Sequence, residues 1–183
     1  VSTEAVRAFE DQKAVPAGKM LAVYNGISLG QFRKSVSGGS QIRSELGLAE
    51  DKKLIVAVGR LSEPKDYPNL LNALARVGNG ISDWHLAVAG GGPLRNNLAS
   101  LTQKLGLGDR VSFLGVRNDI PDLLSAADLF VLSSAWEGFP MVVGEAMACE
   151  CLVVATDCGG VREFLGDSKF LVEANNFEAL AAA

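Results

Sequence analysis

The chain has 183 residues and a formal net charge of −4, with 48% hydrophobic and 21% charged residues. This composition is typical of a globular protein, and the length suits one domain of about 100–200 residues. The net negative charge gives no indication of nucleic-acid binding, so we expect no nucleic-acid partner. No run approaches the roughly 18–20 apolar residues of a membrane-spanning helix.

The three cysteines, Cys149, Cys151 and Cys158, form neither a CxxC pair nor a cluster with histidine. We expect buried thiols in a reducing compartment, which predicts a cytoplasmic protein. The sequence opens without methionine, in VSTEAVRAF, and stops inside the helical pattern NNFEALAAA. We therefore expect it to be part of a longer protein.

In chain order, short apolar runs rich in β-branched residues predict strands that helices cover on both faces. These runs are Met20–Asn25, Lys53–Gly59, Trp84–Gly90, Arg110–Gly115, Leu129–Ser134, Cys151–Thr156 and Lys169–Glu173.

Helical patterns separate these runs, at residues 66–77, 92–107, 119–127 and 141–150. The second pattern has Pro93 in a first-turn position and ends at Gly106. The stretch SVSGGS, Ser35–Ser40, predicts a surface loop. The alternation of strands and helices predicts an α/β fold with a doubly wound, parallel, Rossmann-like sheet. Ligands of such sheets bind beyond the carboxyl ends of the strands, so the loops that follow the strands are the candidate sites.

Two cations follow the second predicted strand, in the loop GRLSEPKDY. The guanidinium of Arg60 and the ammonium of Lys65 suit a diphosphate, because both donate charged hydrogen bonds to phosphate oxygens. The alternative is a solvated loop in which Lys65 pairs with Glu63 or Asp66. The residues alone do not decide between the two.

Three further features predict structure more readily than chemistry. The glycines of Gly90–Pro93 follow the third predicted strand, whereas a nicotinamide fingerprint follows the first, so we expect a tight turn that permits close approach. The only histidine, His85, lies inside a strand pattern and is expected to be packed or at an edge. The sequence has no ligand set for a metal, and we expect neither a metal nor a cofactor.

The stretch WEGFPMVVGEAM holds two glutamates eight positions apart. Pro140 marks the start of a helix, which puts Glu145 in its second turn and Glu137 in the loop before it. The amides of Gly138–Val142 then form an anion site at the helix N-terminus. Carboxylates that bind hydroxyls, beside amides and cations that bind phosphate, match the layout of a nucleotide-sugar. The alternative is a helix-capping Glu137 and a solvent-facing Glu145.

EGFPMVVGEAMACECLVVATDCGGVREFLGD resembles the signature region of the retaining glycosyltransferases of group 1, also called glycosyltransferase family 4. VYNGIS, VAVGRLSEPKDYPNLLNALA, GGGPLRNNLASL and VSFLGVRNDIPDLLSAADLFVLSS match the same family in order and spacing. The resemblance begins near Val23 and covers nearly all of the chain that follows. One departure is Glu150–Cys151–Leu152, where the family often has Gly-x-Pro before the sixth strand.

The resemblance implies two Rossmann-like domains that face each other across a cleft, a glycosyltransferase B-type architecture. Residues 1–183 would be the carboxyl-terminal, donor-binding domain, and residues 1–18 the connecting helix from an absent amino-terminal acceptor domain. Arg60 and Lys65, after Gly59, would hold the donor diphosphate, and Glu145 the ribose hydroxyls. Glu137 would contact the transferred sugar. The remaining implied contacts are Gly138, Phe139, Pro140, Met141 and Val142 to sugar and phosphate, and Val116 and Arg117 to the base.

The implied reaction transfers a sugar from a nucleoside diphosphate, UDP or GDP, to a hydroxyl of a glycan or glycolipid. It retains the anomeric configuration and needs no metal. A peripheral membrane association, at the inner face of the membrane, would come through the absent domain. Same-face attack is favoured over a double displacement with Glu137 as nucleophile. Two other functions stay open: a nucleotide-binding module without catalysis, and a sugar-nucleotide epimerase on the same architecture.

Overall fold

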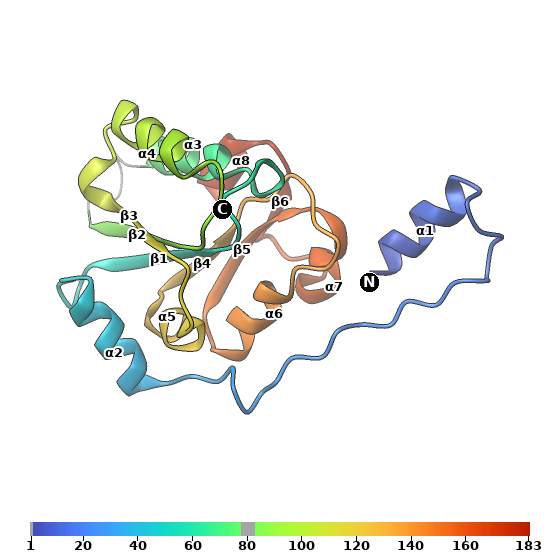
Figure 1. Ribbon diagram of the computed structural model, residues 1–183, viewed down its shortest axis with the longest axis horizontal. Helices are drawn as coiled ribbons and strands as arrows, with labels where there is room; N and C mark the ends of the chain where they lie inside the picture. The colour runs from blue at the N-terminus through green and yellow to red at the C-terminus, as the bar shows by residue number, and fades with distance from the viewer. Residues whose placement is uncertain (1, 78–82) are drawn as a thin grey trace.

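The computed structural model describes residues 2–77 and 83–183 (Figure 1). Within these residues, one parallel six-stranded sheet has the strand order β3-β2-β1-β4-β5-β6. The strands are β1 Lys53–Val58, β2 Trp84–Ala89, β3 Val111–Gly115, β4 Leu129–Leu132, β5 Leu152–Asp157 and β6 Leu171–Glu173. The predicted α/β doubly wound class is confirmed.

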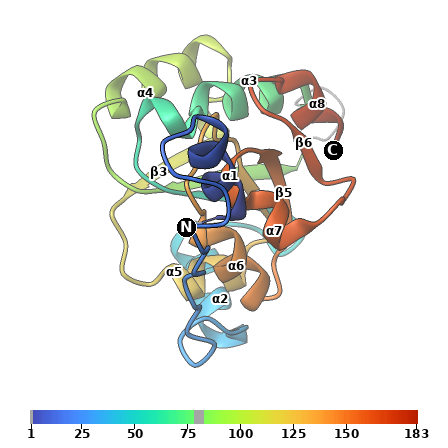
Figure 2. The same ribbon diagram turned by 90° about the vertical axis from the view of Figure 1, so that its right-hand side faces the viewer.

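Helices cover both faces of the sheet and enclose two hydrophobic cores (Figures 1 and 2). Alternate residues of β1 face opposite sides: Leu54 and Val56 pack toward α2, α5 and α6, while Ile55 and Ala57 pack toward α3, α4 and α8. The α-helices are α1 Thr3–Asp11, α2 Val36–Glu45, α3 Tyr67–Val77, α4 Arg95–Lys104, α5 Ile120–Ala126, α6 Met141–Ala148, α7 Arg162–Leu165 and α8 Phe177–Ala182. The 3-10 turns are η1 Glu63–Lys65, η2 Gly108–Arg110 and η3 Gly159–Val161. None of the helices among the described residues is both long and apolar enough to cross a membrane.

The strand predicted at Met20–Asn25 is wrong. This segment is neither helix nor strand, and its side chains are largely exposed, Leu21 by 81% and Val23 by 68%. A strand needs a neighbouring strand for its backbone hydrogen bonds. The segment instead runs outside the sheet from α1 toward α2 (Figure 1).

The surface loop predicted at Ser35–Ser40 is also wrong, because these residues begin α2. The Ser35 hydroxyl caps the helix by accepting from the Gly38 amide at 3.1 Å. The glycines serve a close helix contact: a Cβ on Gly39 would lie 3.0 Å from the Ser125 carbonyl oxygen, and one on Gly38 would lie 1.8 Å from Asp122 Oδ1. The pair therefore lets α2 approach α5.

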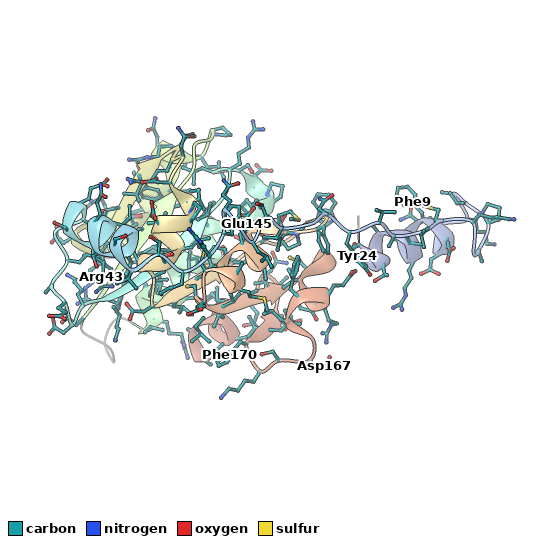
Figure 3. All side chains as sticks on the ribbon, turned by 90° about the horizontal axis from the view of Figure 1, so that it is seen from below. Phe9, Tyr24, Arg43, Glu145, Asp167 and Phe170 are labelled. Carbon is teal, nitrogen blue, oxygen red and sulfur yellow. The ribbon has the colours of Figure 1, made fainter. Side chains whose placement is uncertain are left out.

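The helix expected over residues 1–18 is shorter, because α1 ends at Asp11 and Lys13 adopts a left-handed conformation with φ 57°. Its first residue, Thr3, donates through both its amide and its hydroxyl to Glu163 of α7 at 2.8 Å. Phe9, farther along the helix, lies well away from the sheet and is 50% exposed (Figure 3). Pro93 was predicted in the first turn of its helix, but α4 begins at Arg95, so Pro93 lies before the helix.

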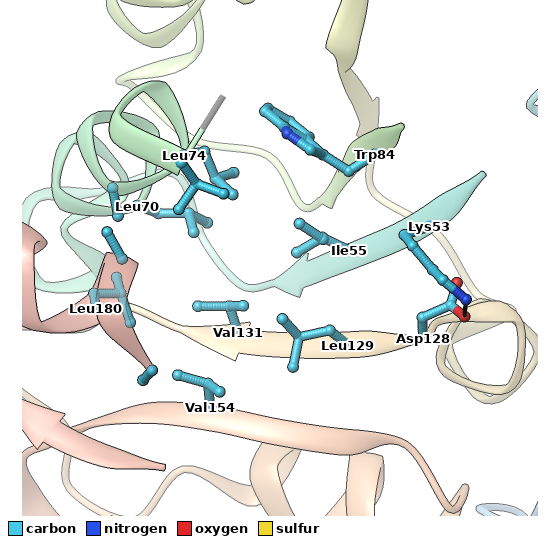
Figure 4. A pocket seen from close by; sticks show the side chains of 14 residues that line it. Lys53, Ile55, Leu70, Leu74, Trp84, Asp128, Leu129, Val131, Val154 and Leu180 are labelled. Atoms are coloured by element: carbon cyan, nitrogen blue, oxygen red, sulfur yellow. Dashed lines mark hydrogen bonds and ion pairs between the residues drawn. The ribbon is translucent and has the colours of Figure 1, made fainter. Parts of the chain in front are cut away.

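An apolar cavity of about 330 Å³ lies between the sheet, α3 and α8 (Figure 4). Leu70, Leu74 and Leu180 line it from the helices, and Ile55 and Val131 from the strands. Lys53, at the start of β1, lines it too, so the cavity reaches the amino ends of the strands. The carboxyl ends, where ligands of this fold class bind, lie at the other end of the sheet.

Candidate active site

The strand order changes direction between β1 and β4, which are neighbours in the sheet. The loop after β1 leads to α3 on one face of the sheet, and the loop after β4 leads to α6 on the other. Two loops that diverge in this way open a crevice at the carboxyl edge, which is the usual ligand site of a doubly wound sheet.

An open cleft of about 450 Å³ lies at this point. Its lining includes many of the residues that the sequence predicts, namely Gly59, Lys65, Glu137, Phe139, Pro140, Met141, Val142 and Glu145. Phe32, Val58 and Ile120 complete it and were not predicted. Val58 ends β1 immediately before Gly59, so its position was open to inference. Phe32 comes from the segment before α2, and no sequence pattern places that segment over the cleft.

An ion pair joins the two loops inside the cleft. The Lys65 ammonium donates to Glu137 Oε1 at 2.5 Å, and their side chains are only 22% and 11% exposed. The Ser134 hydroxyl donates to the same oxygen at 2.6 Å. Lys65 therefore does not form the expected alternative pair with Glu63 or Asp66. The sequence analysis did not single out Ser134, because only the folded loop brings its hydroxyl to Glu137.

The backbones of the two loops are joined as well. The Ala135 amide donates to the Pro64 carbonyl at 2.9 Å, and the Ser133 hydroxyl donates to the Lys65 carbonyl at 2.9 Å. Asp66 ends the turn in a left-handed conformation with φ 41°. These bonds fix the backbone of both loops, so the positions of Lys65 and Glu137 relative to each other are set by more than their own side chains.

The glycine-rich turn after β2 supports the loop after β1. A Cβ on Gly90, whose φ is +142°, would lie 1.9 Å from the Gly59 carbonyl oxygen, and one on Gly92 would lie 2.3 Å from the Leu61 carbonyl oxygen. The Leu61 amide also donates to the Gly91 carbonyl at 2.9 Å. The expectation of a tight turn that permits close approach is confirmed, and the approaching group is the backbone of the neighbouring loop.

The start of α6 faces the cleft. Pro140 is the N-cap, and the first turn closes with the Val143 amide donating to the Pro140 carbonyl at 3.1 Å. The amides of Met141 and Val142 come before that bond, and amides in such positions have no partner within their helix. They carry the positive end of the helix dipole and suit a negatively charged oxygen.

Glu145, which Figure 3 labels, lies in the second turn of α6, as predicted. It lines the same cleft. Its side chain is half-buried, and burial raises the pKa of its carboxyl above the usual range. Among the described residues, no hydrogen bond or ion pair involves this carboxylate. The cleft thus contains one carboxylate that is engaged by a cation and one that is available to a ligand.

Arg60 and the loop after β3 lie at the margin of this arrangement. Arg60 is exposed and does not line the cleft. Arg117 does not line it either, because its guanidinium bonds Asp119 and, through two hydrogen bonds, Glu45. These hydrogen bonds, first to Asp119 and then to Glu45, raise the pKa of Arg117. Val116 is 81% exposed, and Gly138 is exposed at the bend before Phe139.

The residues expected to be structural are buried. His85 packs within β2 with its Nε2 3.0 Å from the Ser112 hydroxyl, and burial lowers its pKa. The three cysteines are buried free thiols, and burial raises the pKa of Cys151 and of Cys158 to about 11. Across the part of the chain that the structure describes, no three His, Cys, Asp or Glu side chains are grouped as a metal site would require.

The fold and the switch-point cleft define a doubly wound domain with a candidate ligand site between the loops after β1 and β4. The family model "Glycosyl transferases group 1" matches residues 40–183. The chain therefore belongs to the group 1 glycosyl transferases.

Named relatives and solved structures agree with this assignment. The chain is 34% identical over 157 residues to the N-acetylgalactosamine-N,N'-diacetylbacillosaminyl-diphospho-undecaprenol 4-alpha-N-acetylgalactosaminyltransferase of Campylobacter jejuni, covering 84% of this chain and 40% of that protein. It is 33% identical to the UDP-Gal:alpha-D-GlcNAc-diphosphoundecaprenol alpha-1,3-galactosyltransferase of Escherichia coli, covering 90% and 44%. The chain thus spans less than half the length of these relatives.

The crystal structure of HepE from Anabaena in complex with UDP and glucose superposes with a TM-score of 0.88 at 31% identity, covering 98% of this chain and 50% of that one. The C-terminal domain of a group 1 family protein from Francisella tularensis shares the fold, with a TM-score of 0.72 at 24% identity, over 86% of this chain and 85% of that domain.

Proposed function

We propose that this chain is the donor-binding domain of a retaining glycosyltransferase, which transfers a sugar from a nucleoside diphosphate to an acceptor hydroxyl. One observation carries the proposal most directly. A cation, the first amides of α6, which have no partner within their helix, and two carboxylates meet in a single cleft at the switch point of the sheet. Phosphate and sugar hydroxyls need these two kinds of group side by side.

In this proposal Lys65 and Arg60 bind the diphosphate, together with the amides of Met141 and Val142. Lys65 already lines the cleft, whereas Arg60 is exposed and does not. In this proposal the Arg60 side chain therefore turns toward the cleft when the ligand binds. These groups stabilise the negative charge that grows on the departing diphosphate, where one donor is worth about 10²–10³ in rate. They neutralise that charge without a metal, so the proposed reaction is metal-independent and uses no cofactor.

The two carboxylates take different parts of the donor. Glu145 has no partner among the described side chains and accepts from the ribose hydroxyls. Glu137 faces the transferred sugar, where positive charge develops. Val116 lies beside the glycine-rich turn after β2, because a Cβ added to Gly91 would be 3.3 Å from its Cγ2. In this proposal its exposed side chain offers an apolar surface to the base. The guanidinium of Arg117 is held by two carboxylates, so Arg117 contributes to this subsite as its support.

The complete enzyme, in this proposal, has a second domain that binds a glycan or glycolipid acceptor, and α1 leads from that domain. The names of the relatives favour a lipid-linked or polysaccharide acceptor and a UDP-sugar donor, with GDP-sugars as the alternative. We also propose that the enzyme acts in the cytoplasm, with its acceptor domain at the inner face of the membrane. Retention follows from attack on the same face of the sugar that the diphosphate leaves.

Product analysis of the complete enzyme with UDP-glucose, UDP-galactose and GDP-mannose tests this function. A transferase releases the nucleoside diphosphate and forms a glycoside of retained configuration only when an acceptor such as a glycosyl-diphospho-undecaprenol is present. An epimerase instead changes the sugar nucleotide without any acceptor. A binding module without catalysis does neither, and either of these two results would contradict the proposal.

A further inference from the structure

The Ser134 side chain is fully buried, and its hydroxyl bonds the carboxylate of Glu137, which the proposed function places at the transferred sugar. The exposed fraction of Ser134 is 0%, and its Oγ donates to Glu137 Oε1 at 2.6 Å. The Lys65 ammonium donates to the same oxygen. Among the described residues, no bond to the second oxygen, Oε2, is found. The carboxylate is therefore held by one oxygen only, which leaves the other available to a ligand.

The backbone on both sides of this bond is fixed. The Thr156 hydroxyl donates to the Ser134 carbonyl at 2.6 Å inside the protein. The Glu137 carbonyl lies against Gly159 so closely that a Cβ there would be 2.0 Å from its oxygen. β5 thus anchors the backbone of Ser134, and the turn that follows β5 packs closely against the backbone of Glu137.

The two donors to Oε1 differ in what else they can bind. Lys65 has a flexible four-carbon stem and an ammonium with three donors, and in the proposed function it also binds the diphosphate. The hydroxyl of Ser134 sits on a short side chain without exposure, so no ligand reaches it. When Lys65 turns toward the diphosphate, only the serine still orients the glutamate.

We propose that Ser134 is a positioning residue for Glu137, which keeps Oε2 of the carboxylate directed at the transferred sugar while Lys65 engages the donor. The inference rests on the proposed function for the role of Glu137, and it assigns no contact between Ser134 and the substrate. It predicts that loss of the hydroxyl affects the rate of the chemical step more than donor binding.

A double-mutant cycle tests this in the complete enzyme, with whichever of UDP-glucose, UDP-galactose or GDP-mannose the wild type uses. Ser134→Ala should lower kcat by about 10–100-fold, the range for a misplaced catalytic group, and change the KM for the donor less than twofold. In a Glu137→Ala background, the same substitution should have no further effect on kcat, because the group that it positions is gone.

Thr102→Val is the matched control, since it also removes a buried hydroxyl, which donates only to the Leu98 carbonyl within α4 and lies outside the cleft. It should leave kcat unchanged, and thermal unfolding of both variants reports any general loss of stability. Equal, additive losses from Ser134→Ala in both backgrounds, or a loss no larger than that of Thr102→Val, would overturn the inference.

A crystal structure of the Ser134→Ala variant with UDP bound separates this inference from the proposed function. The inference expects the Glu137 carboxylate to lose its single orientation, and an unchanged carboxylate would contradict it. If the wild-type enzyme transfers no sugar from any of the three donors, the proposed function fails on that result alone. The orientation of Glu137 can still be tested without nucleotide. A Lys65→Ala variant should keep the single orientation of the carboxylate, and a Lys65→Ala, Ser134→Ala double variant should lose it, because neither donor to Oε1 then remains.

Discussion

The ammonium of Lys65 lies 2.5 Å from Oε1 of Glu137, although the two residues are 72 positions apart in the sequence. One residue comes from the turn after β1 and the other from the loop after β4, so the bond spans the switch point of the sheet. In the proposed function, these are the group that faces the diphosphate and the group that faces the sugar. Each substitution at this pair therefore affects both its partner and the ligand.

The two cations are expected to differ in their effect on stability and to agree in their effect on binding. Lys65→Ala and Arg60→Ala should each weaken diphosphate binding by about 1.5–3 kcal/mol, because each removes a charged hydrogen bond. Lys65→Ala should also lower the free energy of unfolding by about 1–3 kcal/mol, since it leaves a largely buried carboxylate without its cation. Exposed Arg60 should have little effect on unfolding.

Calorimetric titration with UDP and with uridine, together with urea unfolding, measures both effects. Equal losses of affinity for the nucleoside and for the diphosphate would count against a phosphate role for either cation.

The two glutamates should separate in steady-state kinetics of the complete enzyme. Glu145→Gln should mainly raise KM, because a contact with ribose is the same in the ground state and the transition state. Glu137→Gln should mainly lower kcat, by about 10² or more, because its charge matters most as positive charge develops on the sugar. If both variants change only KM, the division between a nucleoside-binding and a sugar-facing carboxylate is wrong.

The pH dependence of unfolding should reveal the burial of Glu145. Its pKa is raised above the ordinary 4.5, so the folded state favours the protonated form relative to the unfolded state. The stability linked to this group is thus fully present below its unfolded pKa, and is lost as pH rises through the folded pKa. Glu145→Gln removes this dependence. Its melting temperature, relative to wild type, should rise across that window, and a difference that does not vary with pH would refute the assignment.

Gly90 should tolerate no side chain. Gly90→Ala places a Cβ 1.9 Å from the Gly59 carbonyl oxygen at a φ of +142°, so the loop that carries Arg60 and Lys65 must shift. We expect a loss of about 2–4 kcal/mol in the free energy of unfolding, and weaker UDP binding. Gly30→Ala is the control, because a Cβ there would meet no atom within 4 Å. Comparable unfolding curves for the two variants would show that the close approach is not required.

The strands were predictable because six of the apolar runs pair in one sheet between two layers of helices, and this position requires apolar residues in each run. Met20–Asn25 has the same pattern without a neighbouring strand, and a single sequence does not reveal that absence. The glycines in the first turn of α2 indicate a loop by composition, but they serve a contact with α5 more than 80 residues away. A local sequence pattern does not indicate contacts with residues that are distant in the sequence.

The candidate site was also predictable only in part. Placing functional residues after strands brought Lys65, Glu137 and Glu145 into one cleft, because parallel strands end at one edge. The Lys65–Glu137 pair was not predictable, and neither was the serine that shares it, since both depend on how two loops approach each other. The family resemblance assigned Arg117 to the base. One of its carboxylate partners, Glu45, ends α2, a helix that the sequence analysis did not predict, and the other, Asp119, precedes α5.

The isolated chain should bind a nucleoside diphosphate weakly and transfer no sugar, because the acceptor and the facing wall of the cleft belong to the proposed second domain. Transfer by the 183-residue chain at a rate close to that of the complete enzyme would contradict the two-domain proposal. A radiolabelled donor with a lipid-linked acceptor provides the assay.

The most direct test of the cleft as a nucleotide-sugar site is calorimetric titration of this chain with UDP, GDP, ADP and the corresponding nucleosides. We predict that at least one diphosphate binds, that its nucleoside binds more weakly, and that an Arg60→Ala, Lys65→Ala double variant binds the two alike. The Gly30→Ala variant should retain wild-type binding. A chain that binds no diphosphate, or a double variant that binds it as tightly as wild type, would contradict the assignment of the cleft.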